Sequence, residues 1–172
     1  MRDDVRIRDV READLELFYQ QQLDPEAVRR SRFPSREREV FMTHWVTKVL
    51  GNPTGLVRAV TVGGEPAGNI VAWWEEQEGA GGQQDHGHVE RRRSIGYWFG
   101  REYWGRGIAT QALTLFLRIE RHRPLYAEVF TGNTASVRLL EKHGFQHAGR
   151  LRHGEDEYAL LVLHEEAAQP AR

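Results

Sequence analysis

The chain has 172 residues, of which 40% are hydrophobic and 28% are charged, and its formal net charge is −1 at pH 7. This length predicts a single domain over residues 1–172, and the near-neutral charge gives no electrostatic case for a nucleic-acid or anionic-membrane partner. The sequence contains no cysteine, which excludes disulfides, cysteine–zinc sites and a covalent acyl-cysteine intermediate. No apolar segment approaches the roughly 20 residues that span a bilayer, and no signal peptide is visible, so we expect a cytoplasmic protein.

The first half of the chain predicts one strand, a series of helical segments and a hairpin. Val5–Arg8 alternates apolar and charged residues, which is typical of a half-buried strand. Apolar residues at helical spacing predict helices over 11–22 and 37–50, and Asp24-Pro25-Glu26 is typical of a helix start. Two apolar runs, 56–62 and 67–74, flank Gly63–Pro66, which predicts a hairpin with a four-residue loop.

The second half predicts strands over 94–99, 125–130, 145–151 and 158–163, with two helices between them and a polar tail from about residue 165. The first helix runs from Ile108 to about Arg121, before Pro124, and is expected to bury Ile108, Ala112, Leu113, Phe116 and Ile119. The second runs over 133–143, with Gly144 as its C′ residue. Together these elements predict an α/β (α+β) fold: a single mixed, mostly antiparallel sheet of about seven strands with helices on both faces.

A turn with two glycines, Gly105 and Gly107, joins the strand ending at Phe99 to the helix that begins at Ile108. The first turn of a helix has N–H groups without internal partners, its dipole favours negative charge, and glycine lets phosphates approach the backbone. The turn therefore indicates a cradle for a cofactor with a pyrophosphate in its middle. The Walker pattern requires Lys and Ser or Thr where Ile108-Ala109 stand, and the dinucleotide fingerprint requires a glycine where Thr110 stands, so both fail. The alternative is an ordinary surface turn before an amphipathic helix.

A second motif runs from Asn133 to Phe145 and reads N-T-A-S-V-R-L-L-E-K-H-G-F. Its purely structural interpretation is a short helix in which Asn133 is the N-cap, Ser136 supports that cap and Gly144 closes the end. In combination with the G-x-G-x-A turn, however, it resembles the GNAT superfamily of acetyl-coenzyme A dependent N-acetyltransferases. The RimJ/RimL-like branch, whose members acetylate protein N-termini, amino acids and small amines, is the most similar. The resemblance extends from Val5 to Leu163 and is supported by Arg11–Leu15, Asp24–Glu26 and Ile95–Trp98.

The resemblance implies the GNAT fold, acetyl-CoA as cosubstrate and roles for particular residues. The strand carrying Tyr97 and the strand carrying Glu128 splay apart in relatives, so that the backbone of residues 97–99 pairs with the pantetheine arm as another strand does. The amides of residues 106–110 hold the pyrophosphate, with the Arg106 side chain nearby, and Asn133 hydrogen-bonds the pantetheine arm. The expected cofactor-binding residues are Tyr97, Trp98, Phe99, Trp104, Gly105, Arg106, Gly107, Ile108, Ala109, Thr110 and Asn133.

Two positions depart from the family pattern. Glu102 stands where many members have Gln or Arg, and we expect it to point away from the pyrophosphate. Leu140 stands where many members have a Tyr that protonates the leaving thiolate, so the proton donor must lie elsewhere. Ser136, one helical turn earlier and near the thioester sulfur in the family pattern, is the best candidate.

Direct attack of a neutral amine on the thioester requires a general base or a water chain. Glu128 is the first candidate, because its strand ends beside Asn133, and we expect Tyr126 and Phe130 on the same face to reduce its solvation and raise its pKa. The alternative is that Glu128 forms an ion pair on the sheet surface. His88 and Glu90 are weaker candidates for the base, and His86-Gly87-His88 lacks a third ligand, so we expect no metal.

The sequence therefore predicts an enzyme that transfers the acetyl group of acetyl-CoA directly to a primary amine of a protein N-terminus, an amino acid or a small molecule. A catalytically silent acyl-CoA-binding sensor or scaffold is the alternative from another class. The resemblance assigns acceptor choice to segments 24–38 and 152–158, whose mixed charges do not identify the amine. Trp73 and Trp74 must point to opposite faces of their strand, so one of them covers either the substrate cleft or the face of a homodimer.

Overall fold

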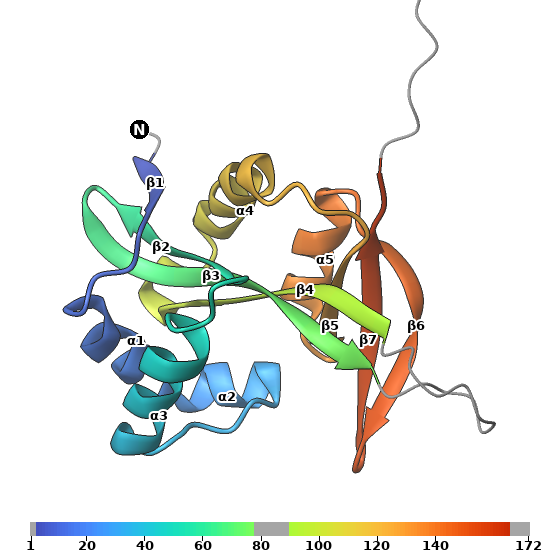
Figure 1. Ribbon diagram of the computed structural model, residues 1–172, viewed down its shortest axis with the longest axis horizontal. Coiled ribbons are helices and arrows are strands. Elements are labelled where there is room, and N and C mark those ends of the chain that lie inside the picture. The colour runs from blue at the N-terminus through green and yellow to red at the C-terminus, as the bar shows by residue number, and fades with distance from the viewer. Residues whose placement is uncertain (1–2, 78–89, 166–172) are drawn as a thin grey trace, which may run out of the picture.

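The computed structural model describes residues 3–77 and 90–165, in which seven strands form one sheet (Figure 1). The strands are β1 (Val5–Arg8), β2 (Leu56–Val62), β3 (Glu65–Gln77), β4 (Glu90–Phe99), β5 (Leu125–Phe130), β6 (Gln146–His153) and β7 (Asp156–Leu163). Their order is β1-β2-β3-β4-β5-β7-β6, and β4–β5 is the parallel pair in an otherwise antiparallel sheet. The predicted fold class is confirmed.

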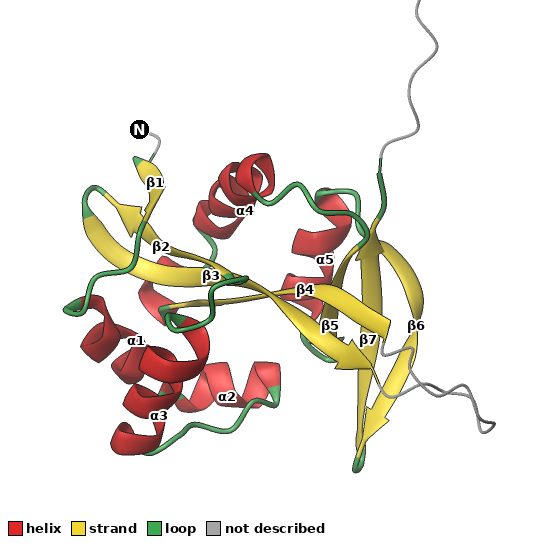
Figure 2. Ribbon diagram, in the orientation of Figure 1, coloured by secondary structure: helices red, strands yellow, loops and turns green. Residues whose placement is uncertain are grey.

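Helices cover both faces of the sheet (Figure 2). One layer contains α1 (Asp14–Gln22), α2 (Pro25–Ser31) and α3 (Arg38–His44), which continues as the π-helical segment η1 (Trp45–Val49). The opposite layer contains α4 (Ile108–Ile119) and α5 (Thr134–Lys142). In the described part of the chain, no helix is both long enough and apolar enough to cross a membrane.

Each helical layer packs on its own face of the sheet through a buried apolar cluster. Phe116 and Leu140, from α4 and α5, pack with Val60 and Ile70 of the central strands. On the other face, the helices contribute Leu15, Phe18, Phe41 and Trp45, which pack against Ala59. Strand residues alternate between the two clusters because successive side chains point to opposite faces. This alternation also decides which site residues lie on which face.

Several local predictions are confirmed. The Asp24 side chain accepts a hydrogen bond from the Glu26 N–H at 3.0 Å, and Pro25 occupies the first helical position of α2. Gly144 follows α5 with a φ of 91°, the left-handed conformation expected of a C′ glycine. The strand predicted over 125–130 has those bounds in the structure.

Other local predictions are wrong. The first hairpin has a two-residue loop, Gly63-Gly64, with φ values of 58° and 87°, because β3 already begins at Glu65. Pro66 is accommodated within the strand pair because the register shifts between Val60 and Thr61. Ile119 is 45% exposed: α4 ends there and the chain turns to bury the Glu120 carboxylate 2.8 Å from the Arg93 guanidinium.

Candidate active site

A gap opens in the sheet between its two parallel strands. β4 and β5 pair only through Arg93–Leu125 and Ser94–Tyr126, although β4 continues to Phe99 and β5 to Phe130. Beyond these two pairs the strands diverge, as the family resemblance implied. In a paired sheet, that edge of β4 would be hydrogen-bonded to its neighbour. The backbone of residues 96–99 therefore presents donors and acceptors along the gap, suited to an extended ligand.

The glycine turn lies at one end of this gap. Gly105 and Gly107 have φ values of 72° and 73°, and no atom lies within 4 Å of the position that a Cβ would occupy at either residue. Gly107 is the N-cap of α4 and brings no side chain that could satisfy the N–H groups of the first turn. The turn thus combines free donors, a favourable helix dipole and open space, which are the features that suit a phosphate group.

A cavity of about 530 Å³ lies over this turn. Ten of the eleven predicted cofactor residues line it: Tyr97, Trp98, Phe99, Trp104, Gly105, Gly107, Ile108, Ala109, Thr110 and Asn133. The Arg106 side chain does not, because its guanidinium is held 2.9 Å from the Asp3 carboxylate and 3.3 Å from the Glu102 carbonyl oxygen. In this structure the Arg106 side chain is turned away from the cavity, and its place beside the pyrophosphate stays a prediction. Glu102 is exposed and lies outside the lining, as expected.

We call the cavity over the glycine turn the cofactor cavity. Three other basic side chains line it. They are Arg30 of α2 and Arg138 and Lys142 of α5. Arg30 is placed by its stacking on Trp104, with its guanidinium carbon 4.6 Å from the ring centroid. We did not predict these residues. The sequence could have indicated Arg138 and Lys142 as cofactor-binding residues, because their spacing of four residues puts both on one face of the helix that follows Asn133.

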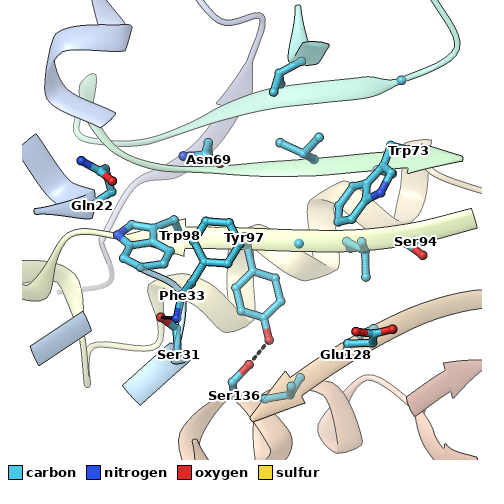
Figure 3. Close-up of a pocket in the computed structure, with 18 of the residues that line it drawn as sticks. Gln22, Ser31, Phe33, Asn69, Trp73, Ser94, Tyr97, Trp98, Glu128 and Ser136 are labelled. Carbon is cyan, nitrogen blue, oxygen red and sulfur yellow. Dashed lines mark hydrogen bonds between the residues drawn. The ribbon is translucent and has the colours of Figure 1, made fainter. Parts of the chain in front are cut away.

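Ser136 and Tyr97 meet where β4 faces the start of α5. The Tyr97 Oη and Ser136 Oγ atoms are 2.5 Å apart (Figure 3). Burial raises the pKa of the Tyr97 phenol to about 12, so it stays protonated at neutral pH. The sequence assigned a role only to the Tyr97 backbone. Strand alternation carried the missed signal, because Tyr97 must face the α4–α5 layer that contains Ser136.

The structural interpretation of Asn133 and Ser136 as a helix cap is not supported. Asn133 occupies the N-cap position of α5, but its side chain makes no capping hydrogen bond. The Ser136 hydroxyl is bonded to Tyr97 rather than to the helix end. Leu140 is fully buried in the core. The polar groups of Asn133 and Ser136 thus remain directed to the cavity that both residues line.

Glu128 lies on β5, on the same side of the gap as Ser136, and Tyr97 reaches toward Ser136 from β4 (Figure 3). It shares its face of β5 with Tyr126 and Phe130, but its side chain is still 38% exposed and lies 3.6 Å from His153. The expected reduction of its solvation by these aromatic neighbours is therefore not seen, since a cavity opens over this face of β5. If Glu128 instead forms an ion pair on the sheet surface, His153 is the available partner. Glu90 is exposed at the start of β4 and lines neither cavity, and His88 lies outside the described residues.

A second cavity, of about 910 Å³, lies between the sheet and the α1–α3 layer. We call it the acceptor cavity. Trp73 lines it, whereas Trp74 packs against His122 with ring centroids 4.5 Å apart, so the two tryptophans serve opposite faces as predicted. Within segment 152–158, only Tyr158 contributes to the lining.

The two cavities meet at the gap between β4 and β5. Of the residues that the structure describes, five line both of them: Ser31, Tyr97, Trp98, Asn133 and Ser136. Glu128 lines the acceptor cavity but not the cofactor cavity. A ligand in the cofactor cavity and a ligand in the acceptor cavity can therefore contact each other beside Tyr97, Ser136 and Glu128.

Comparison with known proteins identifies the class. The fold is that of acetyltransferases: an acetyltransferase of the GNAT family from Streptococcus pneumoniae superposes with a TM-score of 0.70 at 18% identity, over 94% of this chain and 99% of that one. The aminoglycoside acetyltransferase AAC(6')-Ib in complex with coenzyme A gives 0.69 at 19% identity, over 94% and 95% of the two chains. RimJ of Mycobacterium smegmatis in complex with CoA-disulfide gives 0.67 at 21% identity, over 95% and 84%.

Sequence similarity adds the family. Residues 4–146 match the family described as "Acetyltransferase (GNAT) domain", and the chain belongs to this family. The "Uncharacterized N-acetyltransferase p20" of Bacillus licheniformis is 34% identical over 84 residues. This match covers 46% of the chain and spans 44% of the length of that relative.

Proposed function

We propose that this protein is an acetyl-CoA-dependent N-acetyltransferase that transfers an acetyl group directly to a primary amine. The observation that carries the proposal is the meeting of the two cavities at the gap between β4 and β5. One cavity has the open glycine turn and basic side chains suited to a pyrophosphate, and the other lies on the opposite side of the gap. Direct transfer requires that the two ligands meet in a productive orientation, and the shared opening allows this.

The residues present fit acetyl-CoA. The free backbone edge of residues 97–99 is suited to the pantetheine arm, and the amides of residues 106–110 are suited to the pyrophosphate. Arg30, Arg138 and Lys142 supply cations in the lining of the cofactor cavity. Bound acetyl-CoA supplies the activated acetyl group and a thiolate leaving group. The motif from Asn133 to Phe145 supports placement near the RimJ/RimL-like branch.

In this proposal the acid belongs to the α4–α5 layer, and the base lies on the face of β5 that lines the acceptor cavity. Glu128, from the acceptor side, accepts a proton from the attacking amine, directly or through water. Ser136 donates its hydroxyl proton to the departing sulfur, and Tyr97 replaces that proton through the 2.5 Å hydrogen bond. A phenol is a stronger acid than an aliphatic alcohol, so Tyr97 is the better proton reservoir of the pair. The N–C bond forms and the C–S bond breaks; the nitrogen loses one proton to Glu128 and the sulfur gains one from Ser136. Proton exchange of Glu128 and Tyr97 with water then restores both groups.

The test is the release of free thiol from acetyl-CoA in the presence of primary amines and N-terminal peptides. Ser136→Ala should lower kcat by about 10²-fold, a typical contribution of a positioned proton donor, with little change in the Kd for acetyl-CoA. Ser35→Ala is the matched control, because Ser35 is exposed and lines neither cavity. Tight binding of acetyl-CoA without amine-dependent thiol release would instead identify a silent sensor.

A further inference from the structure

The acceptor cavity has one basic wall. Among the described residues of its lining, three side chains are basic, and they belong to the helical side: Arg36 in the linker between α2 and α3, His44 of α3 and Lys48 of η1. Within residues 3–77 and 90–165, no carboxylate lies within salt-bridge distance of Arg36 or Lys48. Two cations therefore face the cavity without a described acidic partner.

Two hydrogen bonds to the Gln22 side chain fix the backbone of Arg36. The buried Gln22 side chain accepts a hydrogen bond from the Arg36 N–H at 2.7 Å and donates one to the Arg36 carbonyl oxygen at 3.1 Å. The Arg36 guanidinium also stacks over Phe33, 5.5 Å from the ring centroid. Figure 3 shows Gln22 and Phe33 at the same end of the cavity. These two hydrogen bonds order the linker before any ligand binds. This lowers the conformational entropy that is lost when a ligand binds.

The pKa of His44 indicates that the three basic groups lie near one another. Burial and the positive charges of Arg36 and Lys48 lower the pKa of His44, so its ring is neutral at pH 7. Lys48 lies one helical turn after His44. The wall thus presents two permanent cations and one neutral imidazole that can donate a hydrogen bond.

The opposite wall, formed by the sheet, carries the acidic groups. Glu128 of β5 lies beside the gap, and Glu75 of β3 accepts a hydrogen bond from Ser94 at 3.0 Å. An attacking amine belongs beside Glu128, in the proposed function. A ligand group that reaches the helical wall meets positive charge. The cavity is near the upper end of the usual range of ligand-site volumes, so it has room for an acceptor longer than a simple α-amino acid.

We propose that the acceptor is a primary amine that also carries a carboxylate or phosphate several bonds away from its nitrogen, with this anion bound by Arg36 and Lys48. The inference rests on the proposed function and refines it by naming the acceptor class. Polycationic amines are disfavoured by the same wall, since like charges in a confined site repel.

The experiment compares three acceptors of similar length: 5-aminopentanoate, its neutral amide and 1,5-diaminopentane. The anion should have the highest kcat/KM, by roughly 10- to 100-fold over the amide, which is the usual worth of a charge-assisted hydrogen bond. In the double variant Arg36→Gln/Lys48→Gln this preference should disappear, while kcat/KM for the neutral amide stays unchanged. Arg118→Gln is the matched control, because Arg118 is exposed on α4, in the opposite layer.

A peptide pair with Asp or Asn at the second position distinguishes a peptide acceptor from a small amine, and preference for the Asp peptide supports the inference. Calorimetry with 5-acetamidopentanoate and coenzyme A gives a readout that does not need turnover. Preference for the amide or the diamine, or anion binding that survives the double variant, would overturn the inference while the acetyltransferase function stands. If coenzyme A binds but no amine promotes thiol release, the proposed function fails. Weaker binding of 5-acetamidopentanoate to the double variant would still support anion binding by Arg36 and Lys48.

Discussion

Gly107 offers the sharpest test of where the cofactor binds. Its φ of 73° is left-handed, and no atom lies within 4 Å of the Cβ that a substitution would add. Gly107→Asp therefore fits the ligand-free fold at a backbone cost of at most about 1–2 kcal/mol, and aspartate tolerates this conformation better than most residues. Its side chain would nevertheless occupy the space proposed for the pyrophosphate and place a negative charge there.

The charge effect can be separated from the steric effect. Two charges about 4 Å apart repel by about 1 kcal/mol at a dielectric constant of ~80 and by about 4 kcal/mol at ~20. Gly107→Asn has nearly the same shape without the charge, so Gly107→Asp should bind coenzyme A at least about 5-fold more weakly than Gly107→Asn. Both variants should bind more weakly than the unsubstituted protein in calorimetry.

The control for backbone strain is Gly63→Asp. Gly63 has a φ of 58° and the same open surroundings, but it lies in the hairpin between β2 and β3 and lines neither cavity. Denaturant unfolding should show similar losses of stability in Gly63→Asp and Gly107→Asp, with coenzyme A affinity retained in the former. Unchanged affinity in Gly107→Asp, or an equal loss of affinity in Gly63→Asp, would refute the placement.

Four further predictions follow from single contacts. Tyr97→Phe should lower kcat about tenfold or more without weakening acetyl-CoA binding, because Ser136 loses its proton source; an unchanged kcat would contradict this role. Glu128→Gln should lose kcat/KM at neutral pH and recover partly at high pH, where the amine is already deprotonated, and parallel pH–rate profiles would make Glu128 structural. Asn133→Ala should raise the Kd for acetyl-CoA yet change the free energy of unfolding by less than ~0.5 kcal/mol, since its side chain does not cap α5. Asp14→Asn should flatten the acid limb of the stability curve: hydrogen bonds from Arg8 lower the pKa of Asp14, so its stabilisation is present above its unfolded pKa of about 3.9 and is lost as the pH falls through the lower folded value.

Local sequence determined the elements whose signals are contained in a few residues. Asp24-Pro25 specified the start of α2, Gly144 the end of α5, and the apolar run 125–130 the strand β5. The glycine turn is of the same kind, because an open left-handed backbone before a helix depends on Gly105 and Gly107 themselves. These features depend on backbone geometry and neighbouring side chains, which adjacent residues supply.

Tertiary structure decided the features that join distant segments. The Tyr97–Ser136 hydrogen bond connects residues 39 positions apart, and it exists because β4 and β5 part after Ser94 and Tyr126. The Arg106 side chain turned to Asp3, 103 residues earlier, which no local pattern predicts. The exposure of Glu128 likewise depends on the cavity that the α1–α3 layer leaves over β5. Side-chain direction and solvation are set by whatever packs across the sheet, so the chemistry of this site follows from the assembled layers.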